Sequence, residues 1–248
     1  MEFDYRLALM TGADIPIPEC QLTVKQPIIE EISVMGEKDF QVGAQLLCMT
    51  KEEFEIEQQL PDINSNFELL MFILSQEEAK EKKIIVKTLL SLLLPKYQII
   101  MTPRSIVCKT DNENFIIDEG NFDSFQKIIK KICGLDKKIE QDGEIHEVYN
   151  PANERAKRIA EKIYKGRAEL AKRRVEANPD DSMFGRYISI LAIGLHMSIE
   201  SLKKLTVFQI IDLFERFTLY VQYDIDLRIR LAGSAPDSPA ENWMKPLH

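Results

Sequence analysis

Hydrophobic and polar residues change their spacing several times along the first hundred residues, and each change predicts an element. The first 25 residues read as extended, because Pro16 and Pro18 cannot lie inside a helix and residues 21–25 alternate polar with apolar. Amphipathic helices are expected from Pro27 to Gly36 and over 37–49, 67–76 and 78–94. Residues 84–94 are apolar on most sides, which is typical of the most buried helix of a domain.

The clearest β pattern follows Pro95. Three short runs, 97–101, 105–109 and 115–117, are rich in β-branched and aromatic residues, and turn-forming residues separate them. This arrangement predicts a three-stranded antiparallel meander. Asn121 then stands as the cap of a helix over 122–132, which Gly134 closes.

The second half of the chain has helical spacing throughout. Asn150 and Pro151 predict the start of a helix that runs to about residue 177. Further helices are expected over 181–195, from Ser198, and from Thr206 to about Ala232. Thr206 and Gln209 have the spacing of a capping box. The last helix carries an apolar stripe of Val207, Ile210, Ile211, Phe214, Phe217 and Val221.

These elements predict an α+β fold. A mixed domain with a small antiparallel β-meander and helices is expected over 1–135, followed by a mostly α-helical domain over 150–232. The polar residues 136–149, with Asp142 and Gly143 at their centre, are interpreted as a linker or an exposed hairpin. The Pro-containing residues 233–248 are interpreted as a flexible tail.

Composition adds limits to this outline. A chain of 248 residues with 45% apolar and 29% charged residues can bury a real core and is of ordinary globular type. The net charge is −8, although residues 151–176 carry +5. Its apolar runs are too short for a transmembrane helix, and its acidic N-terminus differs from a signal peptide, so a location in the cytoplasm is expected.

Residues with catalytic or metal-binding chemistry are sparse and scattered. Cys20, Cys48, Cys108 and Cys133 form no CxxC pair, so buried free thiols are expected rather than disulfides. His146, His196 and His248 each have at most one carboxylate at ligand spacing, which is too few for a metal site. The sequence has no phosphate-binding glycine motif and no nucleophile elbow. It therefore predicts no catalytic, cofactor-binding or metal-binding residues, and no enzyme.

The basic segment 151–176 is the one candidate for nucleic acid. Its densest run is Lys172, Arg173 and Arg174, but glutamates interrupt the segment. Two of these glutamates have a basic residue four positions later, the spacing of an ion pair on a helix surface. A solvated helix face is the favoured interpretation, a docking surface for an acidic protein the next, and nucleic acid the least favoured, because the chain is acidic overall.

Aromatic and methionine side chains in the C-terminal helices predict a protein-binding surface, since such residues make adaptable apolar contacts. A hydrophobic core is the ordinary interpretation of such a stripe, and Trp243 stands either in a docking segment or in an untethered tail. A partner or a second copy of the chain is expected to contact Met183, Phe184, Phe208, Phe214, Tyr220 and Trp243.

Several strings of residues carry a family resemblance. They lie at 14–23 and 36–40 near the N-terminus and at 205–216, 223–226, 230–233 and 241–245 in the C-terminal part. With these strings the chain resembles proteins encoded among the tail genes of bacteriophages and prophages of Gram-positive hosts. Within such gene sets it is similar to tail assembly chaperones, although it is longer than the short members and has two expected domains.

The resemblance implies a non-enzymatic protein that coats the tape-measure protein before the tail tube assembles around it. It offers no catalytic residues to carry over. Two alternatives stay open: a structural virion component, such as a tail or connector protein, and a DNA-binding regulator that uses 151–176.

Overall fold

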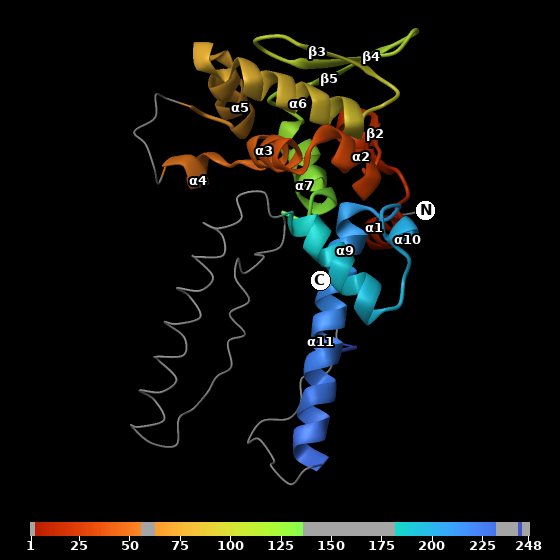
Figure 1. Ribbon diagram of the computed structural model, residues 1–248. Helices are drawn as coiled ribbons and strands as arrows, with labels where there is room; N and C mark the ends of the chain where they lie inside the picture. The colour runs from red at the N-terminus through yellow and green to blue at the C-terminus, as the bar shows by residue number, and fades with distance from the viewer. Residues whose placement is uncertain (1–2, 56–62, 136–181, 232–242, 245–248) are drawn as a thin grey trace, which may run out of the picture.

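The computed structural model describes residues 3–55, 63–135, 182–231 and 243–244. In Figure 1 a small sheet lies at one end of the body, helices fill the middle, and the last helix extends away from the opposite end. The fold is α+β, with the sheets in the N-terminal part and helices in the C-terminal part, as the sequence predicted.

Besides the three strands of the meander, the described N-terminal part has eleven elements. They are α1 (Tyr5–Thr11), β1 (Ile15–Ile17), β2 (Leu22–Val24), α2 (Ile29–Met35), α3 (Glu37–Cys48), α4 (Lys51–Glu55), α5 (Asn66–Ser75), α6 (Lys80–Leu93) and α7 (Phe122–Ile132), with the short 3-10 turns η1 (Pro18–Cys20) and η2 (Glu77–Ala79). β1 and β2 form an antiparallel hairpin in which Ile15 pairs with Val24 and Ile17 with Leu22.

The predicted meander is confirmed. β3 (Gln98–Met101), β4 (Ile106–Lys109) and β5 (Asn114–Ile117) form one antiparallel sheet in the order β3-β4-β5. Ile99, Ile106, Cys108 and Ile117 point to one face of this sheet and are buried. Because alternate residues of a strand face opposite sides, Ile100 and Ile116 lie on the other, exposed face.

The expectation of an extended chain over the first 25 residues was wrong for α1. Asp4 accepts a hydrogen bond from the Leu7 N–H at 2.9 Å, and Gly12 ends the helix with a φ of 73°. Gln26 then donates to the carbonyl oxygens of Ala8 and Ala13 at 2.8 and 2.6 Å, which holds the end of α1 against the body. Local caps and a distant glutamine thus stabilise a helix where the prolines that follow it had suggested none.

Residues 84–94 were expected to form the most buried helix of the domain, but only one face of this helix is buried. Val86, Leu89, Leu90 and Leu93 of α6 are buried, whereas the side chain of Ile84 is 65% exposed. Gly43 of α3 permits close packing of the buried face, because a Cβ at Gly43 would lie 3.1 Å from a methyl group of Leu89. One face of α6 therefore packs on α3, and the opposite face is exposed.

A buried amide network joins α3, α5 and α7. Gln126 of α7 donates to the carbonyl oxygens of Leu47 and Met49 at 3.1 and 2.9 Å, where α3 ends. Asn66 donates to Gln126 at 3.3 Å and accepts from the Lys51 N–H at 3.0 Å. These bonds satisfy carbonyl groups that the end of a helix would otherwise leave unpaired.

The described C-terminal elements are α9 (Met183–Gly194), α10 (Ile199–Leu202) and α11 (Val207–Leu231). The capping box of α11 is confirmed: Thr206 N–H donates to Gln209 at 2.8 Å, and Gln209 N–H donates to the Thr206 hydroxyl at 3.3 Å. The expected helix over 150–177 and the linker 136–149 lie outside the described residues.

Backbone hydrogen bonds join the C-terminal elements to the N-terminal ones. The N–H groups of Ile29 and Glu30, at the start of α2, donate to the carbonyl oxygens of Leu205 and Lys203 at 3.0 and 2.9 Å. Buried residues of α9, α10 and the start of α11 belong to the same hydrophobic cluster as those of the N-terminal part. The division into 1–135 and 150–232 stays a prediction, and residues 182–211 share their core with the first part.

Candidate functional site

The apolar stripe of α11 has two different environments along its length. Val207, Ile210 and Ile211 are buried in the shared core. The same face of the helix continues through Phe214 and Phe217 to Val221 and Ile225, because these positions follow at intervals of three or four residues. We call residues 207–217 the docked half of α11 and residues 218–231 its projecting half; Figure 1 shows the projecting half running clear of the coloured body.

The junction between the two halves is where α9 crosses α11. The rings of Tyr187 and Phe214 stack with their centroids 4.1 Å apart. Phe217 packs directly on the backbone of α9, because a Cβ at Gly194 would lie 2.2 Å from the tip of its ring. Burial raises the pKa of Tyr187 in this contact.

α9 is itself held in place by a residue far away in the chain. Ser182, the N-cap of α9, accepts a hydrogen bond from the Gly185 N–H at 2.8 Å and donates to the Glu37 carboxylate of α3. That carboxylate also accepts from the Phe184 N–H at 3.2 Å, and Phe184 packs edge-on against Phe40. These contacts anchor the start of α9 to α3.

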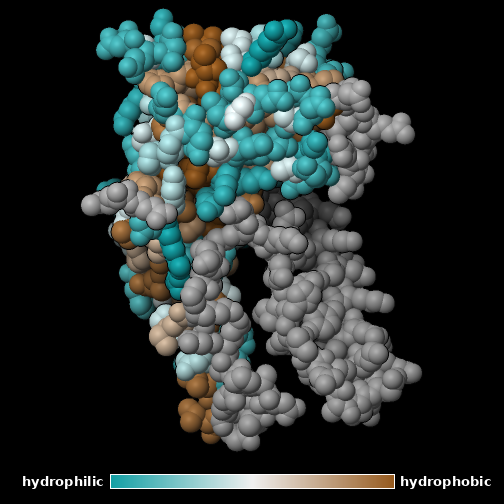
Figure 2. Space-filling view, turned by 180° about the vertical axis from the view of Figure 1, so that it is seen from behind, coloured by the Kyte–Doolittle hydropathy of each residue, from teal (hydrophilic) through white to brown (hydrophobic). Residues whose placement is uncertain are grey.

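The projecting half carries two rows of exposed apolar side chains. Val221 and Ile225, which are 38% and 44% exposed, form the row that continues the core stripe. Tyr220, Leu227 and Leu231 form a second row at helical spacing, and Leu231 is 88% exposed. In Figure 2 brown, hydrophobic side chains lie along this helix and at its far end.

Charged groups lie between and opposite the two rows. Asp224 and Arg228, which helical geometry places between the rows, form an ion pair of 2.8 Å. Gln222 donates to Asp226 at 3.2 Å on the opposite face. The surface of the projecting half therefore offers apolar contacts on both sides of a charged pair.

The six residues predicted to bind a partner do not form one surface. Phe184 and Phe208 are buried in the core, Met183 at the start of α9 is half-buried against the core, and Phe214 is half-buried at the junction with α9. Tyr220 is 50% exposed on the projecting half, and half-buried Trp243 packs edge-on against it with centroids 5.6 Å apart. The prediction that these residues bind a partner stays a prediction, and within the structure only the Tyr220–Trp243 pair lies on the projecting half.

The exposed residues Val221, Ile225, Leu227 and Leu231 were not singled out as partner-binding from the sequence. The length of α11 could have indicated that they are exposed. An apolar stripe on a helix of 25 residues is longer than the part of it that a small core can bury. Ile193 of α9 and Ile199 of α10 are also exposed and lie outside this pattern.

The described residues have little reactive chemistry. All four cysteines are buried free thiols, as expected, and burial raises the pKa of Cys20 to about 11 and that of Cys48 and Cys108 to about 12. Within the described ranges no group of three or more potential ligands could hold a metal ion. Asp118 caps the turn before α7 by accepting from the Gly120 N–H at 3.0 Å. His146 and His248 lie outside the described residues.

Comparison with known proteins gives one match. Residues 177–248 match the family described as YomV second domain, a phage-associated family. No curated protein and no solved structure matches the chain. Among the helices that the structure describes, none is both long and apolar enough to cross a membrane.

Proposed function

We propose that the chain is a non-enzymatic phage protein that binds other proteins during tail assembly, and that it acts as a chaperone for the tape-measure protein. The observation that carries the proposal is the projecting half of α11, which holds two apolar rows away from the core. In this proposal the protein works in the cytoplasm of the bacterial host and needs no cofactor.

The chemistry of the two rows fits a helical partner. An amphipathic helix that lies along α11 would cover Val221 and Ile225 with one side of its own apolar stripe and Leu227 and Leu231 with the other. The Asp224–Arg228 pair between the rows would set the register of the partner's charges. A tape-measure protein is a long helical chain with apolar stripes, and it would aggregate if those stripes stayed bare.

Two further observations support the proposal that the chain is a phage protein. The matched segment 177–248 includes the whole of α11, so the phage-associated likeness covers the proposed binding surface. The sequence strings at 205–216, 223–226 and 230–233 that resemble phage tail proteins lie on or beside the same helix.

A structural component of the virion is the second candidate, because apolar rows of this kind also suit a permanent interface between virion proteins. The two candidates differ in their fate, since a chaperone leaves before the particle matures and a structural component stays in it. The DNA-binding alternative would use 151–176, which lies outside the described residues.

The proposal is tested by co-expressing the full chain with the tape-measure protein from the same phage and measuring how much tape-measure protein stays soluble. The wild-type chain should keep it soluble and co-purify with it. The double variant Val221→Gln, Ile225→Gln should reduce the recovered complex about tenfold or more, because it places two amides where apolar contacts are needed.

The matched control is Ile84→Gln, which makes the same change at an exposed isoleucine on α6, far from α11. It should leave the complex unchanged. If the tape-measure protein is insoluble with the wild-type chain, the chaperone role is wrong. If the chain is found in purified mature particles, the structural role replaces it.

A further inference from the structure

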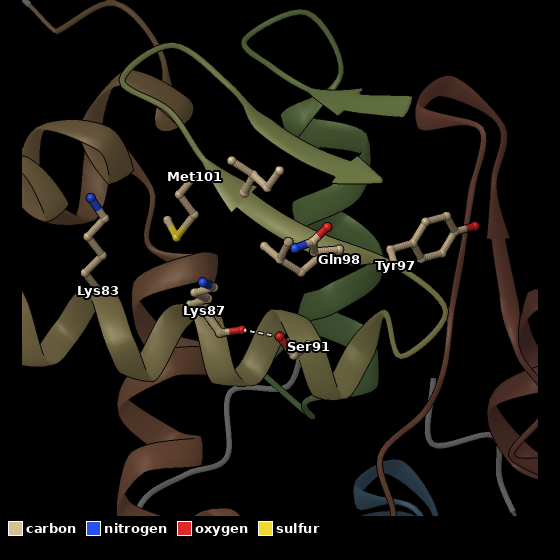
Figure 3. Close-up of a pocket in the computed structure, with 8 residues that line it drawn as sticks. Lys83, Lys87, Ser91, Tyr97, Gln98 and Met101 are labelled. Carbon is tan, nitrogen blue, oxygen red and sulfur yellow. Dashed lines mark hydrogen bonds between the residues drawn. The ribbon is translucent and has the colours of Figure 1, made fainter. Parts of the chain in front are cut away.

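The sheet at the opposite end of the molecule from the projecting half has an open groove along one edge. The groove has a volume of about 400 Å³ and lies between strand β3 and helix α6. Figure 3 shows Lys83 and Lys87 on α6 beside Gln98 and Met101 of β3, while the Ser91 hydroxyl donates back to the Lys87 carbonyl at 2.9 Å. These three α6 residues stand four apart and therefore form one row along the helix.

β3 is an edge strand, and its hydrogen-bonding pattern shows which of its groups face the groove. Thr102 N–H donates to the Ser105 carbonyl at 2.9 Å, so Thr102 and Ser105 form a hydrogen-bonded pair. In an antiparallel ladder such pairs alternate, which places the bonds to β4 at Ile100 and Gln98. The N–H and C=O groups of Ile99 and Met101 then point away from β4 into the groove.

A strand added at this edge would continue two side-chain patterns. Residues opposite Ile99 and Met101 would point to the α6 side, where Lys83 and Lys87 present two positive charges and no acidic side chain lines the groove. Residues that alternate with these would point to the outer face. There Ile100, Val107 and Ile116 lie side by side across the three strands, with Ile100 and Ile116 both exposed.

We propose that the β3–α6 groove binds an extended acidic segment of another protein as a fourth strand of the sheet. Its acidic residues would meet Lys83 and Lys87, and its β-branched residues would extend the Ile100–Val107–Ile116 row. Pairing of β3 with β3 of a second copy is disfavoured, because antiparallel self-pairing brings the lysines of both copies to the same face. This site is separate from the α11 surface and does not depend on it.

The test starts from the full-length chain as bait for a displayed library of random peptides. Selected peptides should alternate acidic with β-branched residues. A synthetic peptide of the selected consensus is then titrated by fluorescence anisotropy. The variant Lys83→Glu, Lys87→Glu should weaken its binding about tenfold or more. The matched control is Lys82→Glu, Lys127→Glu, which makes the same charge change at exposed lysines outside the groove and should leave binding unchanged.

The backbone pairing is tested separately by N-methylating alternate residues of the consensus peptide. Methyl groups on the N–H groups that face β3 should abolish binding, whereas methyl groups on the other set should be tolerated. The amide NMR signals of Ile99 and Met101 should shift on binding.

Four results would overturn the proposal. They are a failure to select any peptide, a consensus without acidic residues, equal effects of the two methylation sets, and binding that survives the Lys83→Glu, Lys87→Glu variant. Concentration-dependent dimers of the chain alone, with the amides of Ile99 and Met101 protected from exchange, would assign this edge to a second copy instead.

Discussion

The docked and projecting halves of α11 have similar residues and different surroundings. Val207 and Ile210 in the docked half are buried, whereas Val221 and Ile225, on the same stripe about three to five turns later, are about two-fifths exposed. The docked half is covered by α1, α7 and α9, and Gln209 also donates to the Met10 carbonyl at 2.8 Å. The comparison teaches that helical spacing determines where the apolar stripe lies on α11. Whether a residue of the stripe is buried depends on which other elements of the chain pack against it.

The largest expected effect is that of a polar side chain in the docked half. Ile210→Gln removes a fully buried isoleucine and leaves an amide without water, so we expect the free energy of unfolding to fall by about 3–5 kcal/mol. Urea denaturation of the variant and the wild type measures the difference. A loss below about 1 kcal/mol would mean that the docked half is not part of the core.

The next effect concerns the contact between α7 and the docked half. Gly134 ends α7 with a φ of 70°, and a Cβ there would lie 2.3 Å from the Cδ1 methyl group of Ile211. We expect Gly134→Ala to cost about 2–4 kcal/mol, since it combines left-handed backbone strain with overpacking.

Ile211→Val removes that methyl group and offers an internal control. Added to Gly134→Ala, it should restore part of the lost stability, although alone it destabilises by about 1 kcal/mol. Strictly additive losses in urea denaturation would show that the two residues do not meet.

A third effect is alkaline loss of the core at the β-meander, at the other end of the molecule from the projecting half. Burial raises the pKa of Cys108 from 9.0 to about 12, so its thiol stays protonated in the folded state while the unfolded chain ionises above pH 9. The unfolded state then binds fewer protons, and the free energy of unfolding falls as pH rises from about 9 toward 12.

The contribution of Cys108 is about 1.4 kcal/mol per pH unit in this range. Cys108→Ala should therefore unfold with a pH slope that is smaller by about this amount, when urea denaturation is compared at pH 9, 10 and 11. Equal slopes for variant and wild type would show that the thiol ionises freely in the folded state.

Much of the fold could be predicted from local pattern. The meander, the helix bounds of α3, α5 and α7, and the capping box at Thr206 depend on spacing and on residues a few positions apart. The end of α2 was likewise readable, because Gly36 has a φ of 98°, which favours glycine.

What could not be predicted depends on contacts between distant residues. Glu37 caps α9 from 145 residues away, and Gln26 holds α1 through two carbonyl groups. The same limit applies to the candidate site. Phe184 and Phe208 match Tyr220 in chemistry, yet only the packing of α9 and α11 decides that the first two are buried and the third is exposed.

The smallest expected effect on stability is that of an isoleucine-to-glutamine substitution in the projecting half, the same substitution as Ile210→Gln in the core. Ile225→Gln keeps a good helix former at a position 44% exposed, so we expect the free energy of unfolding to change by less than about 0.5 kcal/mol. Circular dichroism should show unchanged helix content. If Ile210→Gln strongly lowers the free energy of unfolding and Ile225→Gln does not, Ile225 is not part of the hydrophobic core. A loss of 2 kcal/mol or more, on the order of a buried isoleucine, would instead mean that the projecting half is covered by the chain itself, and the α11 surface would no longer be free for a partner.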